Sequence, residues 1–126
     1  MKAHVAFYRC ETCGNMVELI NKGGGELVCC GKPMTKLEAN TTDASQEKHV
    51  PAVARQGGQL SVEVGSAIHP MTEKHYIEWI AVVTDNGIER VALSPGDEPK
   101  TVFCDKADAD VYAYCNLHGL WKATIG

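Results

Sequence analysis

The sequence predicts an all-β protein in which a small cysteine-rich module precedes an antiparallel β-sandwich. Two observations lead to this fold class. Four of the six cysteines fall within the first 30 of 126 residues, in a segment too short to bury a hydrophobic core of its own. Beyond residue 46, short alternating apolar and polar runs are separated by turn residues at a spacing of about 8–12 residues, which is typical of a sandwich.

The first element is the module, expected over residues 1–37. It opens with the pair Cys10 and Cys13, contains a triple-glycine turn at 23–25, and ends soon after the adjacent Cys29 and Cys30. A segment of this size needs a staple such as a bound metal to be stable. Residues 38–46 are polar and are expected to be a linker. The second domain, with this linker included, spans 38–126.

The strands of the second domain are predicted from the alternation of residues. Leu60, Val62 and Val64 alternate with polar residues, and the denser run 76–83 has one wholly apolar face. An Asp-Asn-Gly turn at 85–87 then predicts a hairpin. The apolar face of the dense run consists of Ile77, Trp79, Ala81 and Val83. Further strands are expected over 88–93, 101–104, 110–115 and 120–125, with a loop over 94–99. One helical turn is expected over 43–48, and Pro51 limits its extent. Tyr114 and Trp121 are expected to pack in the core.

Composition argues against several classes of function. Twelve Lys and Arg against sixteen Asp and Glu give a net charge of −4, whereas a nucleic-acid partner would require a basic surface. No apolar run approaches the roughly 20 residues that a membrane span needs, and the N-terminus lacks the apolar segment of a secretory signal. We therefore expect a cytoplasmic protein. In that compartment, clustered cysteines bind metals or carry redox chemistry more often than they form structural disulfides.

The four N-terminal cysteines are predicted to bind one metal ion. In a Cys-x-x-Cys pair, a tight turn directs both sulfurs to one point, and four thiolates from two short segments suit tetrahedral zinc or iron. The side chains of adjacent cysteines are expected to diverge, which would distort the tetrahedron. The spacing leaves iron and zinc open, and redox disulfides are the alternative. The residues are Cys10, Cys13, Cys29 and Cys30.

A second candidate site comprises four histidines and one cysteine at expected strand ends and turns. Pro70 interrupts the chain between two of the histidines, which predicts a loop there. Five such ligands exceed the usual four of zinc and suit iron with an open position opposite the sulfur, where thiolate pushes electron density onto a small oxygen species. Scattered surface histidines are the alternative. The residues are His49, His69, His75, Cys115 and His118.

Two charged residues precede the first of these histidines. Lys48 could attract an anionic substrate, because long-range attraction raises capture rates. Glu47 could occupy the open metal position between turnovers, and Lys74, beside His75, would add to the positive local field. A solvated surface ion pair is the alternative interpretation of Glu47 and Lys48.

These motifs together resemble the desulfoferrodoxins, the two-iron class of superoxide reductase, over essentially the whole chain. The four N-terminal cysteines are similar to the desulforedoxin-like, rubredoxin-type iron module of that family. Four further segments are similar to its catalytic iron segments: Glu47-Lys48-His49-Val50-Pro51, His69-Pro70-Met71, Glu73-Lys74-His75-Tyr76-Ile77 and Cys115-Asn116-Leu117-His118-Gly119.

The resemblance implies an immunoglobulin-like sandwich for residues 38–126, a homodimer and two iron ions per chain. The four cysteines would bind one iron; the four histidines, with Cys115 axial, would bind the catalytic iron. The implied activity is the one-electron reduction of superoxide to hydrogen peroxide, with rubredoxin as the electron donor. In the family, the residue matching Glu47 can bind oxidised iron and the residue matching Lys48 attracts or orients superoxide. The four-cysteine iron would either relay electrons or act as a structural staple.

Three other functions fit part of the pattern. A blue-copper electron carrier also combines a β-sandwich with an upstream histidine and a Cys-x-x-His turn, but no Met follows His118 and two histidines would have no role. A zinc-stapled binding module would be redox-silent. A dismutase would release dioxygen and need no electron donor. Outside the motifs, His4 is expected at the surface, and Cys104 is expected to be a small buried side chain.

Overall fold

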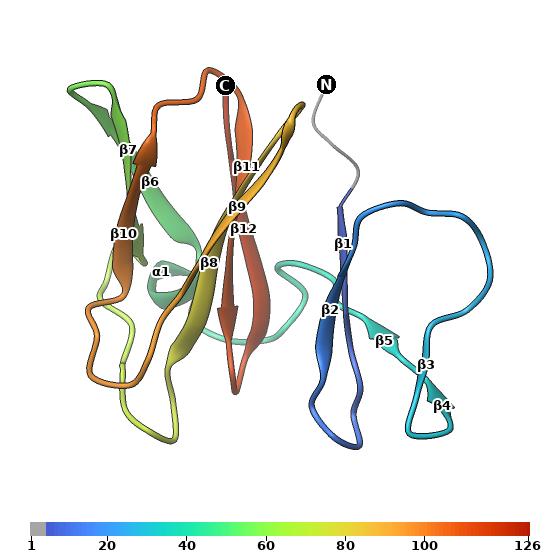
Figure 1. Cartoon of the computed structure of the whole chain (residues 1–126). Coiled ribbons are helices and arrows are strands. Elements are labelled where there is room, and N and C mark those ends of the chain that lie inside the picture. The colour runs from blue at the N-terminus through green and yellow to red at the C-terminus, as the bar shows by residue number, and fades with distance from the viewer. Residues whose placement is uncertain (1–4) are drawn as a thin grey trace. The chain divides into compact units, whose positions relative to one another are not determined.

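A computed structural model describes residues 5–126, so His4 lies outside the described residues. The chain divides into two compact units, an N-terminal one that ends at Glu38 and a second one that spans Ala39–Gly126. Both are built from strands (Figure 1). The all-β fold class predicted from the sequence is therefore confirmed. Within residues 5–126, no helix has the length and apolar character that crossing a membrane requires.

The N-terminal unit consists of five short strands with very little buried apolar surface. One sheet has the order β2-β1-β5 and a second pairs β3 with β4, all antiparallel. Among its described residues, the buried hydrophobic ones are Phe7 and Cys10. Such a unit cannot be held by a hydrophobic core alone. The strands are β1 (Ala6–Arg9), β2 (Met16–Leu19), β3 (Val28–Cys29), β4 (Lys32–Pro33) and β5 (Thr35–Lys36).

The second unit is a sandwich of two antiparallel sheets. One sheet has the order β10-β7-β6 and the other the order β12-β11-β8-β9. One turn of helix, α1 (Gln46–His49), precedes them at the predicted helical turn. The strands are β6 (Pro51–Gln56), β7 (Gln59–Val64), β8 (Ile77–Thr84), β9 (Gly87–Ala92), β10 (Lys100–Cys104), β11 (Ala109–Cys115) and β12 (Gly119–Ile125).

The core of the sandwich lies between these sheets and reaches the end of β11. Leu60, Val62 and Val64 of β7 are fully buried, as the alternation predicts. In β8, however, Ile77 joins Ile80 and Val82 in the core cluster, whereas Trp79, Ala81 and Val83 do not belong to that cluster. The expectation that Ile77 shares a face with those three residues is therefore wrong. The register between β8 and β11 shifts at Tyr114 and Cys115, and such a bulge reverses the alternation of faces.

Two other expectations need correction. Cys104 is exposed rather than buried, because it ends the edge strand β10 directly after the buried Phe103, and successive side chains of a strand point to opposite faces. Strand β6 was not expected from the sequence. It is an edge strand that begins with a proline and carries exposed polar residues at its end, so the alternation signal is weak there.

Candidate metal centres

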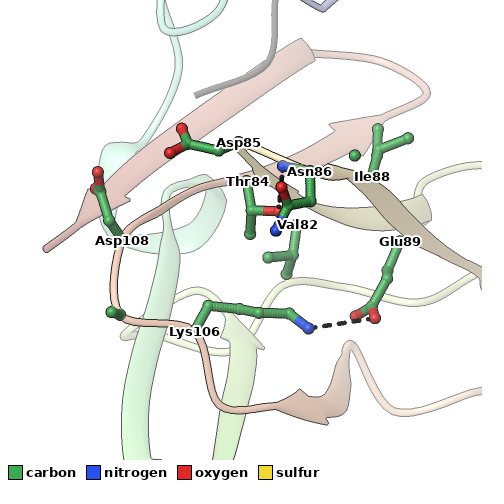
Figure 2. A pocket seen from close by; sticks show the side chains of 10 residues that line it. Val82, Thr84, Asp85, Asn86, Ile88, Glu89, Lys106 and Asp108 are labelled. Carbon is green, nitrogen blue, oxygen red and sulfur yellow. Dashed lines mark hydrogen bonds and ion pairs between the residues drawn. The ribbon is translucent and has the colours of Figure 1, made fainter. Parts of the chain in front are cut away.

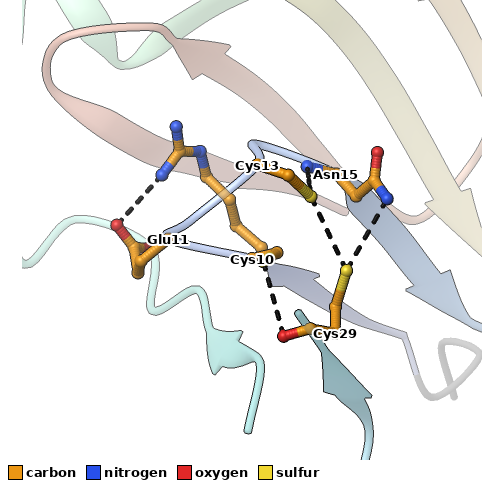
Figure 3. Close-up of polar contacts among 6 residues, drawn as sticks. Cys10, Glu11, Cys13, Asn15 and Cys29 are labelled. Carbon is orange, nitrogen blue, oxygen red and sulfur yellow. Dashed lines mark hydrogen bonds and ion pairs between the residues drawn. The ribbon is translucent and has the colours of Figure 1, made fainter. Parts of the chain in front are cut away.

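The four N-terminal cysteines converge on one point. Their sulfur atoms all lie within 4.8 Å of one another, and Figure 3 shows the Cys13 and Cys29 side chains turned toward each other. The Cys13–Cys29 Sγ distance is 3.6 Å and the Cys29–Cys30 Sγ distance is 4.0 Å. A metal–sulfur bond of about 2.3 Å places tetrahedral sulfurs about 3.8 Å apart. The four thiols therefore fit one tetrahedral metal ion.

Local backbone conformation brings the sulfurs together. The Gly14 amide donates to the Cys10 carbonyl at 2.8 Å, and Gly14 has a φ of +83°, which closes the tight turn that carries Cys10 and Cys13. At the second pair, Cys30 adopts a left-handed φ of +54°. Because of this turn, both adjacent sulfurs face the same point, and the expected divergence of their side chains is wrong.

The protonation of the four thiols favours a bound cation. A hydrogen bond from the Cys13 backbone amide is the main cause that lowers the pKa of Cys10 to about 6. Hydrogen bonding of neighbouring thiols, first of all Cys13, raises the pKa of Cys30 to about 12. Four thiols this close together cannot all ionise on their own, because their negative charges would repel. A bound metal ion displaces their protons and lets all four ionise. The Asn15 side-chain amide lies 3.7 Å from the Cys29 sulfur and donates to it. No motif in the sequence marks Asn15 for this role.

Four histidines of the sandwich form a ring around a second point. His49 ends α1, His69 and His75 lie in the loop from β7 to β8, and His118 lies in the turn from β11 to β12. Taken in this order, neighbouring ring centroids are 4.7, 4.6, 5.0 and 4.8 Å apart, and the His49–His75 diagonal is 6.4 Å. All four neighbouring pairs meet edge to face. The four imidazoles thus surround one point as the corners of a square.

Cys115 completes this cluster. Its sulfur and one nitrogen each of His49, His69 and His75 lie within 4.8 Å of one another. The same sulfur is 3.9 Å from His118 Nδ1, which is itself 3.0 Å from His49 Nε2. Cys115 is fully buried at the end of β11, where regular alternation places it on the same core face as Val111 and Ala113. All five residues predicted from the sequence therefore meet at one site.

The hydrogen bonds of the rings leave lone pairs directed into the site. His49 Nδ1 donates to the Ser45 carbonyl and His69 Nδ1 donates to the Pro70 carbonyl, both at 2.6 Å. A carbonyl only accepts, so the Nε2 atoms of these rings carry free electron pairs. Among the described residues, the buried Nε2 atoms of His69 and His75 have no hydrogen-bond partner. Such orphaned polar atoms are rare in proteins, and a metal ion would satisfy them.

Burial favours the neutral form of three of the imidazoles. It lowers the pKa values of His49 and His75, and that of His69 to about 4. Burial also raises the pKa of Cys115, opposed by the backbone amides of Leu117 and His118. Neutral imidazole is the form that binds metal. Four nitrogen donors and one sulfur exceed the tetrahedral set of structural zinc and suit iron.

Trp121 supports two of the histidines, a role that sequence analysis did not foresee. Its ring stacks on His49 with centroids 4.9 Å apart and an interplanar angle of 26°. Its Nε1 donates to the His118 carbonyl at 3.1 Å. The expected burial of Trp121 and Tyr114 is confirmed. The sequence feature that could indicate this supporting role is the spacing, since Trp121 follows His118 by three residues.

The segment that carries Glu47 and Lys48 is fixed by a close backbone contact. The Glu47 carbonyl accepts a hydrogen bond from the Ala67 amide at 2.8 Å. A Cβ atom on Gly65 would come within 2.4 Å of the same carbonyl oxygen, so this approach requires glycine. The side chains of Glu47 and Lys48 are exposed, next to the buried His49. The positive charge of Lys48 contributes to the lowered pKa values of His49 and His75.

A separate cleft of about 520 Å³ lies beside the β8–β9 turn. Figure 2 shows the ion pair between Lys106 and Glu89 there, with a nitrogen–oxygen distance of 3.3 Å. None of the residues predicted for either metal site lines this cleft.

Comparisons with known proteins agree with both sites. The profile of the family Desulfoferrodoxin matches residues 41–124, and that of the Desulfoferrodoxin N-terminal domain matches residues 3–37. A desulfoferrodoxin homologue from Archaeoglobus fulgidus is 52% identical over 92% of this chain and 94% of its own. A superoxide reductase from Pyrococcus horikoshii is 37% identical over 73% and 97%. The crystal structure of the superoxide reductase from Treponema pallidum superposes with a TM-score of 0.76, at 32% identity over 95% and 98%.

Proposed function

The chain belongs to the desulfoferrodoxin family, and from this premise we propose how its residues carry out their chemistry. The protein is a superoxide reductase with two iron ions per chain. The observation that carries this assignment is the ring of four imidazoles beside one thiol, with two buried ring nitrogens that lack a hydrogen-bond partner in the part of the chain that the structure describes and that a metal ion would satisfy. The reaction adds one electron and two protons to superoxide and gives hydrogen peroxide.

Iron held by His49, His69, His75, His118 and Cys115 would supply the electron for this reduction. The protein's own contribution is the electron-rich donor set. The Cys115 thiolate is the one sulfur ligand of the set, and thiolate donation increases the electron density available to a small oxygen species. An external donor must then restore the electron. The reductase therefore consumes reductant and releases no dioxygen, and these two properties separate it from a dismutase.

The remaining assignments are proposals that the family resemblance supports. We expect domains at 1–37 and 38–126, a homodimer, a cytoplasmic location and electron transport from rubredoxin. The exposed side chains of Glu47 and Lys48, on the segment that ends in His49, support catalytic roles for these two residues. Lys48 would draw superoxide toward the histidine ring, and Glu47 would bind the oxidised site between turnovers.

Replacing Lys48 by alanine should slow the reaction with superoxide. Lys48 lies in a chain of net charge −4 that otherwise repels an anion, and loss of a steering charge lowers capture rates most at low salt. We expect a roughly tenfold lower second-order rate at low ionic strength, with a weaker dependence on salt. Pulse radiolysis measures both quantities.

Lys106→Ala is the matched control for this experiment. It removes the same charge at a position away from the histidine site, because Lys106 precedes the start of β11 and Cys115 lies at the other end of that strand. The control should keep the parent rate. An unchanged rate and salt slope in Lys48→Ala would disprove the steering role.

Replacing Glu47 by alanine should make the oxidised site more accessible to added anions. If the carboxylate binds there, azide and cyanide must displace it in the parent protein but not in the variant. We expect tighter azide binding in Glu47→Ala and also in Glu47→Gln, since an amide is a weaker ligand than a carboxylate. Optical titration of the ferric protein measures the affinity. Glu89→Ala serves as the control, and parent-like azide affinity in both Glu47 variants would refute the role.

A further inference from the structure

The four histidines of the iron site are held in two different ways. His49 and His69 are oriented through their rings, because each Nδ1 donates to a backbone carbonyl. His118 is held through its own carbonyl, which accepts a hydrogen bond from Trp121. The His75 ring has no hydrogen bond among the described residues, and its Nε2 is buried without a partner. The position of this ring therefore depends on the backbone that carries it, together with its edge-to-face contacts with His69 and His118.

Asn116 contacts the backbone on both sides of His75. Its Oδ1 accepts from the Tyr76 amide at 2.9 Å, and its Nδ2 donates to the Lys74 carbonyl at 3.0 Å. The Asn116 amide also donates to the Tyr76 carbonyl at 3.2 Å. These contacts join segments about forty residues apart in the chain. One side chain thus fixes the two peptide groups that flank His75.

The position of Asn116 makes this clamp specific to the site. Asn116 directly follows Cys115, so its hydrogen bonds connect the residue after the sulfur ligand to the segment that carries His75. Apart from the β8–β11 ladder, which pairs Ile77 with Cys115, the other hydrogen bonds of that segment are local. They run between Thr72 and the His75 backbone and from the Ile77 amide to the Met71 sulfur. These local contacts shape the loop, but they do not attach it to the turn that carries Cys115 and His118.

We propose that Asn116 is a positioning residue that holds the His75 imidazole in register with Cys115 in the iron site. This inference rests on the proposed role of His75 as an iron ligand. Partners that orient a ligand typically change metal affinity 10- to 100-fold when they are removed. Asn116 acts on the backbone of His75 and does not itself contact the reacting atoms.

The chain contains a matched control for this clamp. Asn40 also makes two side-chain hydrogen bonds to the backbone of one distant segment. Its Nδ2 donates to the Lys122 carbonyl at 3.1 Å, and its Oδ1 accepts from the Lys122 amide at 2.8 Å. Asn40→Ala and Asn116→Ala therefore lose the same kind and number of side-chain bonds within the sandwich. Only the second change removes contacts to the neighbours of a histidine ligand.

The test compares the iron-loaded parent with Asn116→Ala, Asn116→Asp and Asn40→Ala. Chelator competition measures the iron affinity of the histidine site, with the four-cysteine iron as an internal reference, and hydrogen exchange in the metal-free protein reports on the Tyr76 amide. In Asn116→Ala we expect 10- to 100-fold weaker iron binding and faster Tyr76 exchange. Its melting temperature should be no lower than that of Asn40→Ala, which also places alanine at a φ of +61°. Asn116→Asp keeps the acceptor for Tyr76 but not the donor to Lys74, and should lie between.

The outcomes separate this inference from the proposed function. If the parent holds no iron at the histidine site, both fail. If the parent holds iron there and the Asn116 variants bind it as tightly as Asn40→Ala does, the positioning role alone is overturned. If Asn116→Ala does not fold, Asn116→Asp decides: weakened iron binding supports the proposal, and parent-like binding overturns it.

Discussion

Replacing Cys115 by serine is expected to remove the sulfur-to-iron charge-transfer band of the histidine site and nearly all superoxide reduction. Cys115 is fully buried and, among the described residues, supplies the one thiol of the cluster that it forms with the imidazoles. A serine hydroxyl does not ionise at neutral pH, so the site would lose both a negative charge and a soft, electron-donating ligand. We expect the rate of superoxide reduction to fall by more than about 100-fold. This exceeds the 10- to 100-fold effect that is usual when a residue supporting a metal ligand is removed, because here the ligand itself is lost.

Absorption spectra of the oxidised protein and pulse radiolysis of the reduced protein measure these effects. Cys104→Ser is the matched control, because its thiol is exposed on β10 and takes no part in either site. The control should keep the parent spectrum and rate. Persistence of the charge-transfer band in Cys115→Ser would remove Cys115 from the site.

Replacing Cys13 by serine is expected to unfold the N-terminal unit while the sandwich stays folded. Phe7 and Cys10 are the only described hydrophobic residues of that unit that are buried. A structural metal in a small domain contributes on the order of 10 kcal/mol to folding, far more than two buried side chains provide. Loss of one of four ligands should therefore remove most of the stability of residues 5–38.

Hydrogen exchange followed by mass spectrometry resolves the two units. Amides of residues 5–38 should exchange rapidly in Cys13→Ser, whereas those of β8 and β11 should remain protected because these strands form the centre of the four-stranded sheet. Cys104→Ser again serves as the control. Parent-like protection of residues 5–38 in metal-free Cys13→Ser would show that the unit is stable without its metal.

The sequence predicts the ligands better than it predicts what holds them. Histidines and cysteines are recognisable from residue type and spacing, and strands such as β7 are recognisable from the alternation of Leu60, Val62 and Val64. The bulge that places Ile77 in the core cluster has no such signal, because it depends on the pairing of β8 with β11. The left-handed turn at Cys30 is equally invisible, since non-glycine residues seldom adopt a positive φ.

The supporting contacts depend on residues that tertiary structure brings together. The Ser45 and Pro70 carbonyls orient two rings, and a backbone carbonyl carries no mark in a sequence. Trp121 and Asn116 are close to ligands in the chain, but their contacts with His49 and with the neighbours of His75 join distant segments. The edge strand β6 and the exposed Cys104 escaped prediction because edge positions are only weakly constrained by burial.

The yield of peroxide and dioxygen from superoxide distinguishes a superoxide reductase from a dismutase. The reduced protein is mixed with superoxide in the presence of an electron donor, and both products are measured together with the reductant consumed. A superoxide reductase should form as much hydrogen peroxide as the superoxide it consumes, use an equal amount of one-electron reductant, and release no dioxygen. Dioxygen release with half as much peroxide and no use of reductant would show dismutation and contradict the assignment as a superoxide reductase.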